Sequence, residues 1–440
     1  MGASSSTTAN SQFLDNTLDS GGISAAQMMI IAIALILNIV DGYDVTAMAF
    51  TAHSIGEALS ISPAHLGILF SVALAGMMVG AMFIAPFSDM IGRRKMLLIS
   101  VTFIGISVII TAYSTALWQM ILLRGITGLG VGSMLASLTA ISSEYTPSKY
   151  RSLAVVTITA GYPLGATLGG FIAAPLIPVY GWQSVFLVGG TATLFMVPVI
   201  YFLVPESLQF LVTKRPPNAL QTLNAALTRM NKPTLNQLPE LAQEAKIEKA
   251  NVLSLLTESR RLTTITLWST FFFCFICLYF LMSWIPKLVV NSGLSESEGV
   301  YAAVALNGGG VIGIIVLGWV SSRVSLSKLI STFLSLAALF MMVFASASAS
   351  VNLLLILFVI GFFLQGGFTG LYAVAAKIYP TEIRTTGVGW AIGLGRSGAV
   401  VGPYVGGLLI AGGYSMETNF FLFALPLLIA GVLSFRLAVK

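Results

Sequence analysis

Residues 25–50 read AAQMMIIAIALILNIVDGYDVTAMAF, a long apolar stretch that nevertheless contains two carboxylates, Asp41 and Asp44. About 20 apolar residues in a helix cross the ~30 Å hydrocarbon core of a bilayer, so this stretch is predicted to be a transmembrane helix. An ionisable side chain at the centre of a bilayer costs roughly 2.5–3.5 kcal/mol on insertion scales. The two acids are therefore expected to face a cavity and to have a function.

Similar apolar stretches recur along the whole chain. Of its 440 residues, 56% are hydrophobic and only 9% are charged, and the mean hydropathy is +0.92. Soluble proteins carry about 25% charged residues, so this composition indicates a protein whose solvent is lipid. We predict twelve transmembrane segments, at residues 26–51, 65–88, 96–116, 118–142, 152–175, 183–204, 263–289, 299–321, 327–347, 351–376, 386–411 and 416–436.

The only long polar interval separates the first six segments from the last six. The predicted fold is an all-α membrane protein with twelve transmembrane helices in two six-helix bundles that repeat each other. Short interfacial helices are expected at 219–230 and 238–250, inside the polar interval. The predicted organisation is a disordered tail (1–25), an N-terminal bundle (26–204), a linker (205–262) and a C-terminal bundle (263–440).

One constant shift in numbering aligns the two halves, for example Gly128 with Gly361 and Arg151 with Arg384. Such a duplication is typical of transporters, whose substrate site lies between the repeats near the middle of the membrane. The charges inside the segments are not repeated. The same shift aligns Asp41, Asp44, Arg124 and Arg396 with Cys274, Cys277, Leu357 and Pro163. The scaffold therefore does not require these charges, which favours a functional role for them.

The basic residues are distributed asymmetrically. All but three of the 22 Lys and Arg fall at the C-terminal end and in loops that share one side, the exceptions being Arg124, Lys287 and Arg396. By the positive-inside rule, both termini and the linker are expected to be cytoplasmic. The net charge of +6 follows from this topology and needs no nucleic-acid partner. Lys287, close to the opposite end of its segment, is expected to extend its amine into water.

Several motifs resemble those of the major facilitator superfamily. Residues 85–95, APFSDMIGRRK, resemble its G-x-x-x-D-R-x-G-R-R loop, with Ala85 and Met90 as departures, and RGITGLGVGSMLAS (124–137) matches its R-G-x-x-G-x-G-x-G pattern. ISSEYTPSKYRS (141–152), KIYPTEIRTTG (377–387) and PESLQFL (205–211) resemble cytoplasmic signatures of its sugar and organic-acid carriers. The resemblance implies conformational roles for Asp89, Gly92, Arg93, Arg94, Glu144, Arg151, Glu382 and Arg384. Arg93 and Arg94 are expected to stay in water.

DGYD (41–44) resembles the D-G-x-D motif of the aromatic acid:proton symporter family within that superfamily. The resemblance implies import of a benzoate-like or hydroxybenzoate-like compound with protons across a bacterial inner membrane, in support of aromatic hydrocarbon catabolism. It also implies that both acids are needed for transport. We expect no enzyme activity, no metal site, no cofactor other than the coupling proton, and a functional monomer.

The residues themselves suggest how the roles divide. Asp41 and Asp44 share a helix face, and Asp41 lies about 22 Å along a helix that begins near residue 26. Arg124 enters from the opposite surface to a comparable depth, so we expect it beside this face, as a functional partner or as a structural ion pair. Arg396 is the preferred anchor for a carboxylate, because a guanidinium presents a planar fork and small residues surround it; the alternative is an internal clamp.

Importing an anion against a negative interior costs about 2.3 kcal/mol per 100 mV, and one proton moved with it cancels that cost. Further candidates for the substrate site are Asn38, Tyr43, Tyr279, Trp284, Asn307, Phe368 and Tyr372, each of which packing alone would also explain. Three other functions stay open: a sugar or cyclitol-acid (quinate-like) proton symporter, a drug exporter, and a transporter-like receptor.

Overall fold

The computed structural model describes residues 18–19, 22–239, 255–258, 260–321, 323–346, 353–379 and 383–437. Within these residues, twelve helices are long and apolar enough to cross a membrane, and they match the predicted segments to within a few residues. They are α2 (Ala25–Phe50), a continuous run from α4 (Pro63–Val79) to α5 (Ser88–Ile91), α6 (Arg93–Thr111), α7 (Leu117–Tyr145), α8 (Arg151–Tyr180), α9 (Gln183–Leu203), α12 (Arg261–Asn291), α13 (Glu296–Val320), α14 (Leu326–Ser346), α15 (Leu353–Ile378), α16 (Arg384–Ala411) and α17 (Met416–Arg436).

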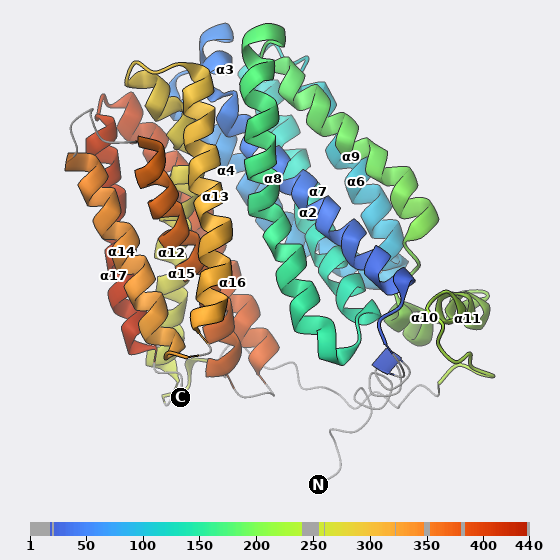
Figure 1. The fold of residues 1–440 in the computed structure, drawn as a ribbon. Helices are drawn as coiled ribbons and strands as arrows, with labels where there is room; N and C mark the ends of the chain where they lie inside the picture. Colours follow the sequence, from blue (N-terminus) through green and yellow to red (C-terminus); the bar gives the residue numbers. More distant parts are fainter. Residues whose placement is uncertain are drawn as a thin grey trace.

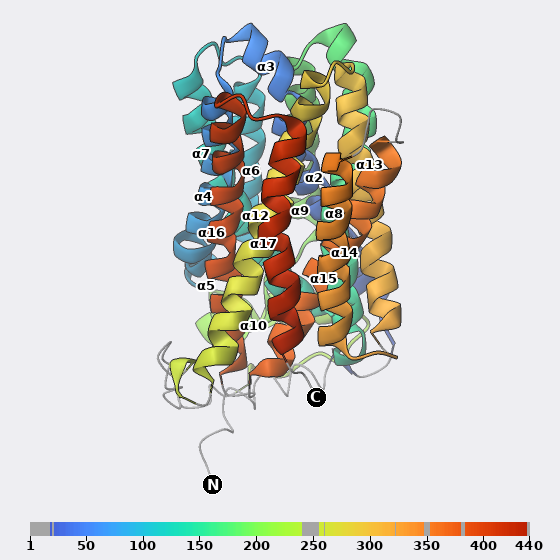
Figure 2. The same cartoon turned by 90° about the vertical axis from the view of Figure 1, so that its left-hand side faces the viewer.

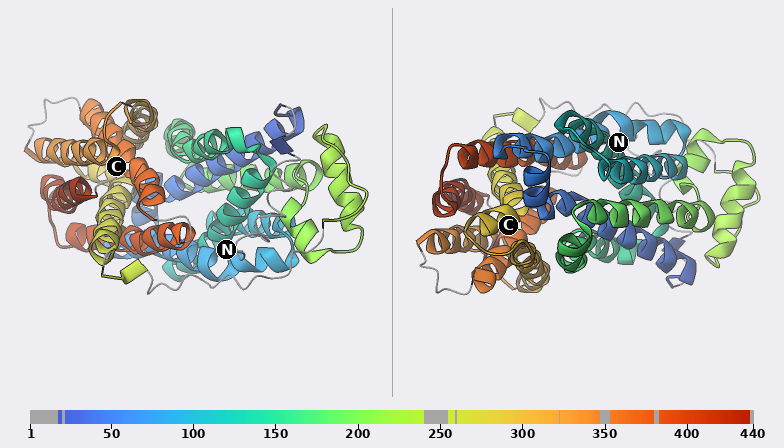
Figure 3. Two further views of the ribbon diagram at one scale, coloured as in Figure 1. Left: turned by 90° about the horizontal axis from the view of Figure 1, so that it is seen from below. Right: turned by 90° about the horizontal axis from the view of Figure 1, so that it is seen from above.

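The helices form two bundles, which we call the N-bundle (α2 to α9) and the C-bundle (α12 to α17). They lie side by side when the molecule is viewed along the helices (Figure 3). In the N-bundle α2 packs on α8, α4 on α7 and α6 on α9; in the C-bundle the corresponding pairs are α12 with α16, α13 with α15, and α14 with α17. The predicted pair of six-helix bundles is thus confirmed.

Close helix contacts at glycines repeat in the two bundles. A Cβ on Gly128 would overlap the carbonyl oxygen of Ala73, and a Cβ on Gly361 would overlap that of Leu306. The shift that aligns Gly128 with Gly361 also aligns Ala73 with Leu306. Small residues let membrane helices approach to backbone distance. The internal duplication read from the sequence is therefore also present in the packing.

The helix that carries the two aspartates is held at both ends. Ser24 caps its start with a capping box shared with Gln27, whose side chain also donates to the carbonyl oxygen of Tyr145 on α7 (2.9 Å). The helix ends at Phe50, and a short helix, α3 (Ala52–Ala58), follows. The Gln27 hydrogen bond ties the start of α2 to the end of α7.

In the linker, α11 (Ala219–Arg229) confirms the helix expected at 219–230, and α10 (Leu208–Lys214), which the sequence analysis did not predict, follows Ser207. The helix expected at 238–250 lies almost entirely outside the described residues. So does most of the predicted tail.

The two bundles touch mainly at one end, opposite the end where α2 begins and α17 ends; we call these the closed end and the terminal end. The contacts are made by α4 with α16, α8 with α13, and α2 with α12. Ser71 donates to the carbonyl oxygen of Val400 (2.7 Å) and Ser297 to that of Ala174 (3.1 Å). Figure 1 shows α8 and α13 close together at the closed end and apart at the terminal end, and Figure 2 shows the long helices running between these two ends.

Lys287 lies at the closed end and is not extended into water as predicted. Only 8% of its surface is exposed. Its Nζ lies against Gly56 of α3, 3.4 Å from where a Cβ of that residue would stand, and it interacts electrostatically with Glu57 and Glu296. Ser54 of α3 donates to the Glu296 carboxylate through both its hydroxyl and its backbone N–H. The expectation failed because α3 folds over the end of α12 and covers the amine.

Candidate functional site

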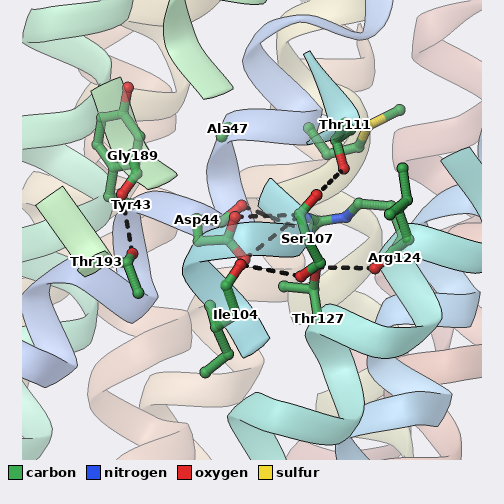
Figure 4. A network of polar contacts seen from close by, with 12 residues as sticks. Tyr43, Asp44, Ala47, Ile104, Ser107, Thr111, Arg124, Thr127, Gly189 and Thr193 are labelled. Carbon is green, nitrogen blue, oxygen red and sulfur yellow. Dashed lines mark hydrogen bonds and ion pairs between the residues drawn. The ribbon is translucent and has the colours of Figure 1, made fainter. Parts of the chain in front are cut away.

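Asp44 and Arg124 form a buried ion pair in the middle of the N-bundle. Arg124 Nη1 lies 3.2 Å from Asp44 Oδ1 and 3.4 Å from Oδ2, and both residues are 2% exposed (Figure 4). Arg124 therefore does lie against the aspartate face, as expected from its depth along α7. The pairing leaves Asp44 committed to a single basic partner inside its own bundle.

Hydroxyl groups order the helices around this pair. Ser107 of α6 and Thr127 of α7 share a hydrogen bond of 2.8 Å, and Thr127 also donates to the carbonyl oxygen of Leu123 (Figure 4). Thr111 donates to the carbonyl oxygen of Ser107, one turn away on α6. The bond between Ser107 and Thr127 joins α6 to α7 one turn from Arg124.

Asp41 is in a different situation from Asp44. It is 3% exposed, and neither of its carboxylate oxygens has a hydrogen-bond partner among the described residues. It lies within electrostatic range of Asp44, Arg396 and Arg124. A buried carboxylate without a partner is unfavourable as an anion, so this position suits a group that holds a proton for part of a cycle.

Arg396 faces the N-bundle from α16. It is half-buried and makes no hydrogen bond or ion pair with the part of the chain that the structure describes. Its neighbour Gly395 lies directly on Phe271 and Phe275 of α12, where a Cβ would come within 2.7 Å of Phe271 Cβ. A guanidinium held inside a membrane protein without an anionic partner in contact is the feature expected of a site for an anionic ligand.

Aromatic rings line the C-bundle beside Arg396. Phe275 stacks on Tyr279 with the ring centroids 5.9 Å apart and meets Phe368 edge-to-face at 4.8 Å. Tyr372 contacts Phe271 edge-to-face at 5.3 Å and Phe368 at 5.5 Å. We call Phe271, Phe275, Tyr279, Phe368 and Tyr372 the aromatic wall. Tyr279 and Tyr372 interact electrostatically with Arg396, so the wall and the cation belong to one region.

A small cavity of about 30 Å³ lies between the two bundles. Asp44, Arg124 and Thr127 line it from the N-bundle, and Tyr279 and Ser283 line it from the C-bundle. Its volume has room for one or two water molecules. The cavity therefore suits water beside the ion pair and is too small for an aromatic ring in this conformation.

Four predicted binding residues have contacts within their own bundle. The Tyr43 hydroxyl donates to the carbonyl oxygen of Val185 inside the N-bundle (2.8 Å), and Trp284 is fully buried and donates to the carbonyl oxygen of Pro403 (2.8 Å). Asn307 accepts from Gln365 (3.2 Å) and donates to the carbonyl oxygen of Ala303 within the C-bundle. Asn38, one turn from Asp41, packs against Gly161 of α8.

A polar network connects the loops at the terminal end of the N-bundle. Arg93 pairs with Asp89 and with Glu144, and Glu144 also accepts from the hydroxyl of Ser207 (2.6 Å). Only 15% of the Arg93 side chain is exposed, so the expectation that it stays in water was wrong. The reason is that the start of the linker folds back under α5 and α6.

Arg94 and Gly92 belong to the same network. Arg94 donates to the carbonyl oxygen of Tyr201, and its backbone N–H donates to Glu206 (3.0 Å). Gly92 has a φ of +103°, and a Cβ there would overlap the Glu206 carboxylate. Glu206, in the PESLQFL motif, is a member that the sequence analysis did not single out.

Arg151 donates through Nε to the carbonyl oxygen of Ser143 (3.1 Å), near the same loops. In the other bundle Glu382 lies outside the described residues, and Arg384 begins α16. No group of three His, Cys, Asp or Glu that could hold a metal ion occurs in the described ranges. The two cysteines are free and fully buried, consistent with apolar packing.

Tyr162 on α8 is the most important residue that the sequence analysis missed. Its hydroxyl faces that of Tyr279 across the two bundles, and it interacts electrostatically with Asp41 and Arg396. A signal was available, since the internal shift aligns Arg396 with Pro163, the residue that follows Tyr162. The duplicated position of the C-bundle anchor therefore pointed to this part of α8.

Comparisons with known proteins agree with this architecture. The family model described as Major Facilitator Superfamily matches residues 31–350 and 301–440. The chain is 32% identical to the gallate transporter of Pseudomonas putida over 93% of its length and 91% of the relative's. It is 32% identical to the 4-hydroxybenzoate transporter PcaK of Pseudomonas aeruginosa, over 93% and 92% of the two chains, and 27% identical to the benzoate transport protein of Acinetobacter baylyi, over 94% and 90%.

Solved structures share the fold. A D-xylose-proton symporter superimposes with a TM-score of 0.74 at 16% identity, covering 93% of this chain and 98% of that one. A bacterial homologue of the human lysosomal transporter Spinster gives a TM-score of 0.71 at 17% identity, with coverages of 94% and 98%. The resemblance noted in the motifs is thus confirmed over nearly the whole chain. The protein is a multi-pass membrane transporter that belongs to the Major Facilitator Superfamily.

Proposed function

We propose that the protein imports an aromatic carboxylate together with a proton, by exposing one central site alternately to the two sides of a bacterial cytoplasmic membrane. The observation that carries the proposal is a pair of ionisable side chains without partners in contact, one on each bundle. The Arg396 guanidinium has no anionic partner in contact, and Asp41 has no hydrogen-bond donor among the described residues. The names of the relatives, which carry gallate, 4-hydroxybenzoate and benzoate, support the class of substrate.

In this proposal Arg396 binds the carboxylate and the aromatic wall receives the ring. A guanidinium offers two parallel N–H donors that match the two oxygens of a carboxylate. The substrate ring then packs on Phe275, Phe368 and Tyr279 in a stacked or an edge-to-face geometry. Both geometries already occur among these three rings. An aromatic acid therefore satisfies the charge and the apolar surface together, whereas a sugar lacks the anion for Arg396.

The two aspartates have separate tasks in the proposal. Asp44 serves as the ion-pair partner of Arg124 inside the N-bundle. Asp41 carries the coupling proton, because it is equally buried and has no such partner. One proton moved with one monovalent anion removes the roughly 2.3 kcal/mol per 100 mV that the anion alone would have to overcome.

The orientation is also part of the proposal. With both termini in the cytoplasm, as the distribution of Lys and Arg favours, the closed end faces outward. The described conformation is then the one that opens inward. Return to the outward-open state requires the contacts of α4 with α16 and of α8 with α13 to separate. We propose further that the chain acts as a monomer and needs no cofactor besides the proton.

Uptake into proteoliposomes tests the proposal. The purified protein is expected to accumulate labelled benzoate, a hydroxybenzoate or gentisate when the pH is lower outside, and to lose accumulation when the gradient is collapsed. Arg396→Lys is expected to raise the KM for the acid at least tenfold with normal expression, because the planar fork is lost. Arg229→Lys, in the exposed part of α11, is the matched control. Uptake of quinate but of no aromatic acid would refute the aromatic substrate, and gradient-independent accumulation would refute symport.

A further inference from the structure

Tyr162 and Tyr279 bring two phenol groups together between the bundles. Tyr162 stands on α8 of the N-bundle, where its backbone lies directly on Gly42 of α2, next to Asp41. Tyr279 stands on α12 of the C-bundle and belongs to the aromatic wall. Both side chains interact electrostatically with Arg396. The pair therefore lies between the proposed proton site and the proposed carboxylate anchor.

The hydroxyl groups of this pair have hydrogen-bonding capacity left over. The Tyr162 hydroxyl is buried, and although it faces the hydroxyl of Tyr279 it does not form a hydrogen bond of regular geometry. A phenol can donate one hydrogen bond and accept another, so each of the two hydroxyls can form a further hydrogen bond. Buried polar groups in native proteins usually find such a partner, which here points to a ligand.

Other polar groups of the region are already engaged. Asn307 and Gln365 bond to each other, Asp44 pairs with Arg124, and the Tyr43 hydroxyl donates to a backbone carbonyl. The rest of the aromatic wall near Arg396 is made of phenylalanine rings and Tyr372. Apart from Tyr372, a polar substituent on a ring held by Arg396 would therefore meet a neutral donor and acceptor at Tyr162 and Tyr279, the two phenols that face each other across the bundles.

We propose that Tyr162 and Tyr279 bind a hydroxyl group on the ring of the substrate, so that the transported acid is a hydroxylated aromatic carboxylate. This inference rests on the proposed function and deepens it. A site that hydrogen-bonds a substrate hydroxyl rejects the analogue without it, because its buried polar groups are then left unpaired. Tyr162 is in this view a specificity-determining residue that acts together with Tyr279 across the two bundles.

The test compares substrates and variants in one experiment. KM values for benzoate, 3-hydroxybenzoate and 4-hydroxybenzoate are measured in proteoliposomes for the natural protein, Tyr162→Phe and Tyr279→Phe. The natural protein is expected to prefer one hydroxylated acid to benzoate at least tenfold. Each variant is expected to reduce that preference to threefold or less by raising the KM for the hydroxylated acid, because phenylalanine keeps the ring and removes only the hydroxyl. Tyr43→Phe, which removes a hydroxyl bonded inside the N-bundle, is expected to leave the preference intact.

A second measurement avoids the variants altogether. The natural protein is expected to bind 4-fluorobenzoate no better than benzoate if the preferred hydroxyl is in the para position, since fluorine has a similar size and cannot donate. An undiminished preference in both tyrosine variants, an equal loss for all acids, or tight binding of the fluorinated acid would overturn the inference. Transport of benzoate and hydroxybenzoates alike would overturn it and leave the proposed function standing, whereas transport of no aromatic acid would refute both.

Discussion

At the scale of single residues, Asp41 and Asp44 lie only three residues apart on one helix but have different chemical environments. Asp44 has Arg124 at 3.2 Å, and Asp41 has no partner for either oxygen in the described part of the chain. Both are buried to the same degree. The same substitution at the two positions should therefore have different consequences for stability and for transport.

Asp44→Asn is expected to destabilise the protein by about 3–5 kcal/mol, because it leaves the Arg124 guanidinium buried and unpaired. Asp41→Asn is expected to leave the melting temperature in detergent unchanged or slightly raised. It should abolish accumulation driven by a proton gradient and spare exchange of labelled for unlabelled substrate. Melting curves, gradient-driven uptake and counterflow on the two variants give the comparison.

The double variant Asp44→Asn/Arg124→Gln provides the control for this pair. It removes both charges, so it should recover much of the stability lost in Asp44→Asn. Equal melting temperatures for the two single variants, or full gradient-driven accumulation by Asp41→Asn, would contradict the assignment of Asp41 as the proton carrier.

At the scale of helices, the close contact of α2 with α8 sets the position of the aspartate face. A Cβ on Gly165 would overlap the carbonyl oxygen of Ile39 on α2, whereas nothing lies within 4 Å of one on Gly389. Gly165→Ala is expected to destabilise the protein by about 1–3 kcal/mol through overpacking. Gly389→Ala should be neutral or stabilising by a few tenths, because alanine favours a helix. The melting temperatures of the two variants are measured in the same detergent. Equal melting temperatures would show that the contact of Gly165 with Ile39 is loose.

The closed end depends on a second set of contacts between elements. Glu296 accepts from Ser54 of the other bundle, whereas Glu298, among the described residues, accepts only from Ser295 at the start of its own helix. Glu296→Gln is expected to weaken closure, since a charge-assisted contact between the bundles becomes a neutral one. Glu298→Gln changes the same chemical group without touching the other bundle and is the matched control.

Opening of the closed end can be measured with Ser283→Cys, which places a thiol in the cavity between the bundles. Cys274 and Cys277 are replaced by serine in the same protein, so that the introduced thiol belongs to its single cysteine. A membrane-impermeant thiol reagent added from outside is expected to label this cysteine several times faster in Glu296→Gln than in Glu298→Gln. Equal labelling rates would mean that Glu296 does not hold the closed end together.

At the scale of the whole molecule, one proton and one monovalent anion should cross the membrane together without net charge. Uptake at a fixed pH gradient is then expected to be independent of the membrane potential. If the anion crossed alone, 100 mV would change its accumulation by about 2.3 kcal/mol, or close to fifty-fold. Accumulation measured at clamped potentials of about −100, 0 and +100 mV distinguishes these outcomes, and a steep dependence would require another proton number.

Features that depend on local sequence were predicted correctly, and features that depend on contacts between distant segments were not all predicted. The number and bounds of the transmembrane helices, the duplication and the position of the charged residues were all readable from the sequence, because hydropathy and helix length act locally along the chain. Arg124 was correctly expected beside α2, because depth in a membrane follows from the number of residues. Lys287 and Arg93 were misjudged because segments distant in sequence cover them.

The sequence by itself determined a twelve-helix membrane protein with two acids in its first helix and one arginine inside each of two other helices. Only the tertiary structure decided that Arg124 forms its ion pair with Asp44 and not with Asp41. It also decided that the Tyr43 hydroxyl bonds inside its own bundle and that the Tyr162 hydroxyl faces that of Tyr279. Asp44 and Arg124 are 80 positions apart. Which of two acids on one helix face meets a given arginine depends on how neighbouring helices are rotated against each other, and glycine contacts such as Gly165 on Ile39 set that rotation.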